Sequence, residues 1–213
     1  REDGLPPWEA FMPVMFATTG DWDDYARDVR RTLKAAAKES ATVESLAAEA
    51  RAQAKDPAAA VQAIRDVVAK RIRYAGPALD DLPLSAVSTA DVTLADGYGT
   101  GADVAVLLYA LLREAGFRPE FVLASSLPMI GAIEDAIVQF PSTGTFGDVL
   151  VKVHLRDLGD IYLNDTQQYA ALGATGHDGR LALNLRKAKP MRVAAAPGKS
   201  DYQEVLYTLR VDE

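Results

Sequence analysis

The chain of 213 residues has 30 acidic and 23 basic residues, a formal net charge of −7. Hydrophobic residues make up 49% and charged residues 25%, as in an ordinary globular domain. This charge argues against a nucleic-acid-binding surface, and no segment approaches the roughly 20 apolar residues of a membrane span, so we expect no membrane insertion.

The chain has no cysteine and only two histidines, His154 and His177. Disulfides, thiolate metal sites and thiol catalysis are therefore excluded, and no metal or cofactor is expected. The first residue is Arg1 rather than methionine, so we expect the chain to be a piece of a longer protein, with any leader peptide outside it.

The first half of the chain has the periodicity of helices. Residues 1–20 predict an extended lead-in, and a helix is expected from Asp21. Alanine-rich sequence predicts further helix up to residue 54, with a break near Ser40. Asp56 followed by Pro57 is typical of a helix start. Residues 75–96 show little periodicity and predict a long irregular segment.

A glycine-rich elbow, residues 97–103 (Gly-Tyr-Gly-Thr-Gly-Ala-Asp), precedes a strongly apolar helix predicted over residues 104–115 and ended by Gly116. A tight turn before a buried helix explains this elbow better than a phosphate site, because no strand and no lysine complete a nucleotide-binding motif. Asp103 is interpreted as an early-turn acid that stabilises the helix dipole.

After residue 116 the pattern changes to short strands, and no alternation of strand and helix is visible. This order predicts an α+β fold in which N-terminal helices pack on an antiparallel sheet with meander topology. We expect one domain over residues 21–213, with a helical part over about 21–116 and a β part over about 119–211. Strands are predicted at residues 120–124, 149–155, 160–163, 181–185 and 204–211.

Several motifs along the chain resemble the transglutaminase-like core of bacterial proteins that carry a DUF3857-type domain. They are Gly20-Asp21-Trp22, Ile72-Arg73-Tyr74, the helix after the elbow, and the run Tyr162 to Thr166. The resemblance covers about residues 5–186. It implies a papain-like fold in which a helix carries a catalytic cysteine and an antiparallel sheet carries histidine and aspartate.

The three catalytic positions of that family are all altered here. Gly101 stands where the resemblance implies the cysteine, Asp148 the histidine, and Asn164 the aspartate, unless the register shifts and Asp165 takes that place. Thiol catalysis needs a nucleophile, an imidazole and a group that orients it. The resemblance therefore implies a scaffold without the family's chemistry, so no catalytic residue is expected.

The remaining polar and aromatic candidates are interpreted by context. A binding cleft is expected to involve Gly101, Asp148 and Asp165, His154 is expected to be a partly exposed strand residue, and His177 a turn residue. The basic stretch over residues 180–192 predicts a solvated strand and loop. The other expected cleft residues are Tyr98, Gly99, Thr100 and Tyr169.

These observations favour a catalytically inactive transglutaminase-like domain that serves as a peptide- or protein-binding or structural module of a larger bacterial protein. The alternative is a hydrolase with a rewired acid/base site that uses Asp148 and Asp165. A peptide or protein ligand and other domains of the same chain are the expected partners. The resemblance implies a periplasmic or extracellular location.

Overall fold

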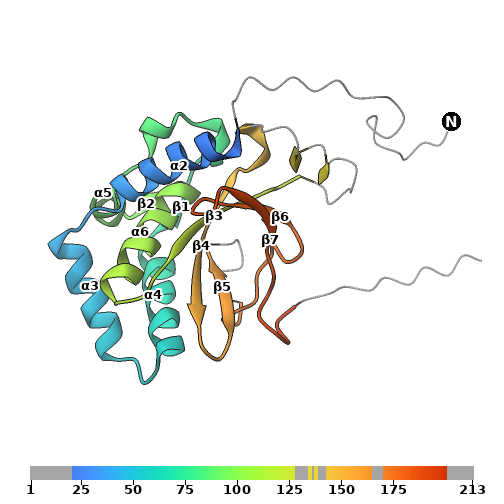
Figure 1. The fold of residues 1–213 in the computed structure, drawn as a ribbon. Helices are drawn as coiled ribbons and strands as arrows, with labels where there is room; N and C mark the ends of the chain where they lie inside the picture. The colour runs from blue at the N-terminus through green and yellow to red at the C-terminus, as the bar shows by residue number, and fades with distance from the viewer. Residues whose placement is uncertain (1–20, 128–133, 136, 139–142, 165–169, 201–213) are drawn as a thin grey trace, which may run out of the picture.

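The computed structural model describes residues 21–127, 134–135, 137–138, 143–164 and 170–200. Helices α2 to α6 gather on one side of a five-stranded sheet (Figure 1). This arrangement confirms the predicted α+β class. The strand predicted at residues 204–211, the lead-in at residues 1–20, Asp165 and Tyr169 lie outside the described residues. No helix within the described ranges is long and apolar enough to cross a membrane.

Helices α2, α3 and α4 begin at the residues that the sequence indicates. Their bounds are α2 Trp22–Ala36, α3 Ala41–Ala52 and α4 Pro57–Arg71. Asp21 and Asp56 are the N-caps of α2 and α4, where their carboxylates accept hydrogen bonds from the backbone N–H groups of Asp24 and Ala59. Local capping chemistry therefore decides where α2 and α4 start, whereas Ser40 at the start of α3 makes no side-chain capping hydrogen bond.

The segment at residues 75–96 is more ordered than predicted. It contains the 3-10 turns Leu79–Asp81 and Leu84–Ala86 and a short helix, α5, Ala90–Asp96. The prediction of a wholly irregular segment was wrong. Helix α5 is only seven residues long, and its two buried side chains, Ala90 and Thr93, give almost no apolar periodicity.

Helix α6, Gly101–Glu114, lies at the centre of the fold. It contacts α2, α3, α4 and α5 as well as strands β3 (Glu120–Ala124) and β4 (Asp148–Leu155). Eight consecutive side chains, from Ala105 to Leu112, are buried. A helix that is apolar on all sides is stable only when other elements surround it, and this explains its central position.

The sheet is antiparallel throughout, but it is not a meander. Strands β5 (Gly159–Leu163), β6 (Leu181–Asn184) and β7 (Lys189–Arg192) complete it in the order β5-β4-β3-β6-β7. The predicted meander topology was wrong, because β6 pairs with β3 rather than with β5. Strand β3 has four buried residues in a row, which suits a central strand covered on both faces.

Candidate functional site

A two-stranded parallel ladder holds the glycine-rich elbow in place. Strand β1, Arg73–Tyr74, pairs with β2, Tyr98–Gly99. The backbone N–H groups of Arg73 and Ala75 donate to the carbonyl oxygens of Gly97 and Gly99, both at 2.9 Å. The Ile-Arg-Tyr motif therefore fixes the chain immediately before the first turn of α6.

A capping box closes the N-terminus of α6. The Thr100 hydroxyl accepts from the Asp103 N–H at 3.3 Å, and the Asp103 carboxylate accepts from the Thr100 N–H at 2.9 Å. Asp103 also accepts from the backbone N–H of Ser88 at 2.7 Å and is only 4% exposed. The interpretation of Asp103 as an early-turn acid of a buried helix is confirmed.

The elbow glycines meet different surroundings. A Cβ atom at Gly99 would lie 2.8 Å from the Cβ of Asp103, which real side chains do not tolerate. A Cβ atom at Gly101 would meet nothing closer than the Tyr74 ring at 3.4 Å. The first helical position of α6 thus has room for a side chain, and packing does not explain its absence.

The three positions aligned with the catalytic triad converge on one cleft. Gly101, Asp148 and Asn164 all line a cavity of about 460 Å³ between α4, the start of α6 and the start of β4. Its aliphatic walls include Val68, Ile72, Val104 and Val149, and Tyr74, Ala78 and Gly147 line it as well. Tertiary structure therefore brings together residues from separate segments, of which Gly101 and Asn164 are 63 positions apart in the chain.

The Asn164 side chain ties the helix to the sheet. Its amide nitrogen donates to the carbonyl oxygens of Gly101 and Val149, each at 2.7 Å. The backbone of Asn164 has a φ of 72°, a left-handed conformation that asparagine tolerates better than most residues. Asn164 thus acts as a structural cross-link, because its two amide hydrogens are directed at backbone carbonyls.

The cleft also contains a histidine that sequence reasoning interpreted only as a turn residue. His177 is 8% exposed, and its Nε2 atom lies 4.0 Å from Oδ2 of Asp148. The turn that carries it is held by the Gly179 N–H, which donates to Val193 O, and by the Ala195 N–H, which donates to the Asp178 carboxylate. No local motif marks His177, because the loop before β6 reaches Asp148 only in the folded sheet.

The segment that leads into Asp148 is anchored by aromatic packing. Phe146 is fully buried and packs edge-on against Trp22, with ring centroids 5.3 Å apart. Trp22 also contacts the Tyr25 ring, and burial together with the nearby Asp80 carboxylate raises the pKa of Tyr25 to about 12. Helix α2 therefore fixes the approach of β4 to the cleft.

Other predicted cleft residues lie elsewhere. Tyr98 is 58% exposed and, like Gly99 and Thr100, does not line this cavity, whereas Tyr74 does. The described residues contain no cluster of three or more His, Asp or Glu side chains able to hold a metal ion. Asp165 and Tyr169 fall in a gap of the described chain, so their places in the cleft stay predictions.

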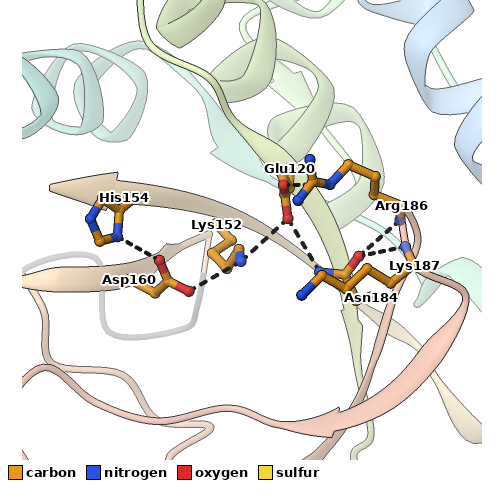
Figure 2. Close-up of polar contacts among 7 residues, drawn as sticks. All are labelled: Glu120, Lys152, His154, Asp160, Asn184, Arg186 and Lys187. Carbon is orange, nitrogen blue, oxygen red and sulfur yellow. Dashed lines mark hydrogen bonds and ion pairs between the residues drawn. The ribbon is translucent and has the colours of Figure 1, made fainter.

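His154 belongs to a row of charged side chains that crosses the sheet outside the cleft (Figure 2). In the row, here called the charge ladder, the ion pairs are Arg186–Glu120 at 2.7 Å, Glu120–Lys152 at 3.3 Å and Lys152–Asp160 at 3.1 Å. At its end, Nδ1 of His154 lies 2.9 Å from Oδ1 of Asp160. His154 is 71% exposed at its side chain, as expected.

The ladder shifts the ionisation of its members. The pKa of Asp160 is lowered by hydrogen bonds from His154 and Lys152, which outweigh the opposing effect of burial. The pKa of Glu120 is lowered against burial by Asn184, Lys152 and Arg186, and that of Lys152 is raised against burial by Asp160 and Glu120. The members of the charge ladder therefore pair with one another and form a structural network.

The helices packed on an antiparallel sheet, with the starts of α6 and β4 meeting at the cleft, match a transglutaminase-like, papain-like fold in two comparisons. Residues 44–128 match the sequence model of the transglutaminase-like superfamily core. This segment is therefore transglutaminase-like, in agreement with the resemblance of the sequence motifs.

The three-dimensional comparison agrees on the fold. A crystal structure from Parabacteroides distasonis, described as a "putative protease", superposes with a TM-score of 0.60 at 18% sequence identity. The match covers 83% of this chain but 32% of that protein, so the chain spans about a third of its length. No curated protein sequence gives a significant match.

Proposed function

We propose that this domain is catalytically inactive and binds an extended peptide or protein segment in the cleft lined by Gly101, Asp148 and Asn164. The observation that carries the proposal is the glycine at the first position of α6, next to an open cavity of about 460 Å³. The cleft offers space and shape, but position 101 has no side-chain nucleophile for acyl transfer.

Asn164 is the second residue at a triad-aligned position that supports inactivity. An orienting residue must direct its polar atoms at the catalytic ring, whereas the Asn164 amide donates to two backbone carbonyls. The cleft walls are mostly aliphatic with a few converging polar groups, which is the usual composition of a ligand site.

The same reasoning extends to the cellular context. The match covers 32% of the solved structure's chain, which is therefore more than twice as long as this chain, and the motifs resemble DUF3857-type proteins. The domain is therefore proposed to be a module of a larger bacterial protein, with a periplasmic or extracellular location and with other domains of that chain as partners.

The proposal is tested by measuring binding and turnover on the same preparation. Pools of acetylated hexapeptides are expected to raise the melting temperature by a few degrees, because a ligand that binds only the folded state stabilises it. Hydrolysis of the same peptides, and transfer of a fluorescent amine to casein, are expected at the buffer rate. Turnover above that rate that disappears on replacing a cleft residue would overturn the proposed inactivity.

A hydrolase with a rewired acid/base site is the second candidate function. The sequence indicated Asp148 with Asp165 for this role, and the distance of 4.0 Å between Asp148 and His177 now supports Asp148 with an imidazole instead. Hydrolysis of p-nitrophenyl acetate would separate the two functions. The enzyme hypothesis requires a rate that His177→Asn removes and that His154→Asn leaves unchanged.

A further inference from the structure

The two-stranded sheet of β1 and β2 has a free edge. The two strands form a sheet of their own beside the start of α6 (Figure 1). In a parallel pair, successive residues of a strand turn their backbone groups to opposite sides. The N–H groups of Arg73 and Ala75 donate to β2, so the N–H and C=O of Tyr74 point away from it. Among the described residues, no partner from another element satisfies these two groups.

The cleft runs along this edge. Its lining includes Ile72, Arg73 and Tyr74 in succession, whereas neither residue of β2 is part of it. Tyr74 is 66% exposed, and its ring lies 3.4 Å from the position that a Cβ atom would take at Gly101. A segment in the cleft can therefore lie alongside β1 and pair with it as a third strand. Addition of a strand to a free edge is a common way for a domain to hold an extended peptide.

An exposed cation stands at the same edge. Lys70, Arg71 and Arg73 are all exposed, and within the described ranges none of them forms an ion pair. Lys70 and Arg71 lie in the last turn of α4, where a cation stabilises the helix dipole. Arg73 lies beyond that helix, in the extended backbone of β1. The helix dipole therefore accounts for the first two cations but not for Arg73.

We infer that the cleft binds its peptide as a third strand beside β1 and selects an aspartate or glutamate side chain at the position next to Arg73. This inference rests on the proposed peptide-binding function. Side chains that face each other across paired strands stabilise the pair when their charges are opposite. The net charge of −7 repels polyanions such as nucleic acids, whereas a single carboxylate needs only a local cation.

The test uses three pools of acetylated, amidated hexapeptides with a fixed central residue and all other positions mixed. The central residues are glutamate, its near-isostere glutamine, and lysine, and affinities for the 213-residue chain are measured by fluorescence polarisation. The glutamate pool is expected to bind about fivefold more tightly than the glutamine pool, the upper range for an exposed ion pair. This preference is expected to shrink in about 1 M NaCl, because salt screens exposed charges.

Three variants at exposed positions assign the preference. Arg73→Gln is expected to reduce the glutamate preference to less than about twofold, and Arg73→Glu to transfer the preference to the lysine pool. Lys70→Gln removes the same charge from the end of α4 and is expected to leave the preference unchanged. Melting temperatures of the three variants verify that each is folded.

Two further comparisons test the strand pairing. Neighbouring N–H groups of a strand point in opposite directions, so N-methylation of a single glutamate-pool peptide is expected to weaken binding about fivefold at one position and less than twofold at the adjacent positions. Tyr74 and Tyr98 are both exposed tyrosines, on β1 and β2 respectively. Tyr74→Ala is expected to weaken the binding of every pool, and Tyr98→Ala is the matched control that leaves it unchanged.

The outcomes separate the inference from the function on which it rests. Equal binding of the glutamate and glutamine pools, or a preference that survives Arg73→Gln, would leave peptide binding intact and overturn the selection of an acidic side chain. Tolerance of N-methylation at every position would overturn the strand pairing. A lysine pool that binds best to the wild type would also overturn the inference, in favour of Asp148 as the recognising charge. If no pool binds, the peptide function fails as well.

Discussion

The two histidines of the chain each face an aspartate, and the two pairs differ in location, in distance and in surroundings. His154 and Asp160 lie on the outer surface of neighbouring strands, 2.9 Å apart, in a ladder of alternating charges. His177 and Asp148 come from a loop and a strand start, lie 4.0 Å apart, and line a cavity. The strand pair is set by sheet register, and the cleft pair by the packing of a loop.

The comparison shows that the same two residue types can stand in different surroundings within one chain. In the ladder every charge has a close partner of opposite sign, so the network has little left to offer a ligand. In the cleft the two polar atoms lie 4.0 Å apart at the wall of a cavity. Histidine–aspartate proximity alone therefore does not indicate function, because the same pair of residue types occurs on the surface of the sheet and beside a cleft.

The largest expected effect tests Asn164, which fixes the floor of the cleft. Asn164→Asp places a carboxylate against the carbonyl oxygens of Gly101 and Val149, so we expect a loss of about 3 kcal/mol in the free energy of unfolding at pH 7. Because this environment disfavours the charged form, the pKa of the new carboxyl rises, and the deficit shrinks as the pH falls. Urea denaturation at pH 7 and pH 4 measures both.

Asn164→Gly is the matched control for that experiment, because glycine keeps the left-handed backbone and removes only the amide. It is expected to cost about 1–2 kcal/mol, with no pH dependence of its own. A glycine variant as unstable as the aspartate variant would show that charge plays no part.

The next effect compares the histidines directly. His177→Asn is expected to lower the free energy of unfolding by about 2 kcal/mol because His177 is buried. His154→Asn removes one member of an exposed pair and is expected to cost less than about 1 kcal/mol. Chemical denaturation of both variants checks the order, and equal losses would contradict the distinction between the two pairs.

A smaller effect tests whether the elbow keeps its capacity to activate a thiol. Gly101→Cys places the chain's single thiol at the first position of α6, where the helix N-terminus lowers a thiol pKa. Its reaction with iodoacetamide at pH 7 is expected to be about tenfold faster than that of free cysteine.

Glu114→Cys, at the C-terminal end of the same helix, is the control and is expected to react no faster than free cysteine. The double variant Gly101→Cys/Asp148→His keeps Asn164, whose amide links the helix to the sheet, so we expect it to fold. This double variant is expected to show weak esterase activity. Equal rates for the two cysteine variants would show that the elbow no longer activates a thiol.

The smallest effect concerns the pH dependence of the ladder. The pKa values of Glu120 and Asp160 are lowered in the folded state, so their stabilisation is present above roughly pH 4 and is lost as the pH falls through their folded pKa values. Lys152→Met removes the central cation and is expected to cost about 1 kcal/mol at pH 7, and less at pH 3.

Melting temperatures of the wild type and of Lys152→Met between pH 3 and pH 7, taken at intervals of roughly one pH unit, measure this convergence. Parallel curves for the two proteins would show that the ladder contributes no pH-dependent stability.

The helices and most strands were predictable because their signals are local. Asp21 and Asp56 mark helix starts by capping chemistry, and the alternation of Val149, Val151 and Val153 marks β4. Helix α5 was missed because seven residues carry too little periodicity. The order of strands was missed because β6 could pair with either β5 or β3 without any change in its own sequence.

By itself the sequence determined the transglutaminase-like motifs, the absence of thiol chemistry and the glycine at the head of the central helix, since each depends on residue identity or short spacing. Only the tertiary structure decided that Gly101, Asp148 and Asn164 line one cleft, that the Asn164 amide donates to two backbone carbonyls, and that His177 faces Asp148. Those contacts join segments far apart in the chain, and their geometry depends on how helix, sheet and loop pack together.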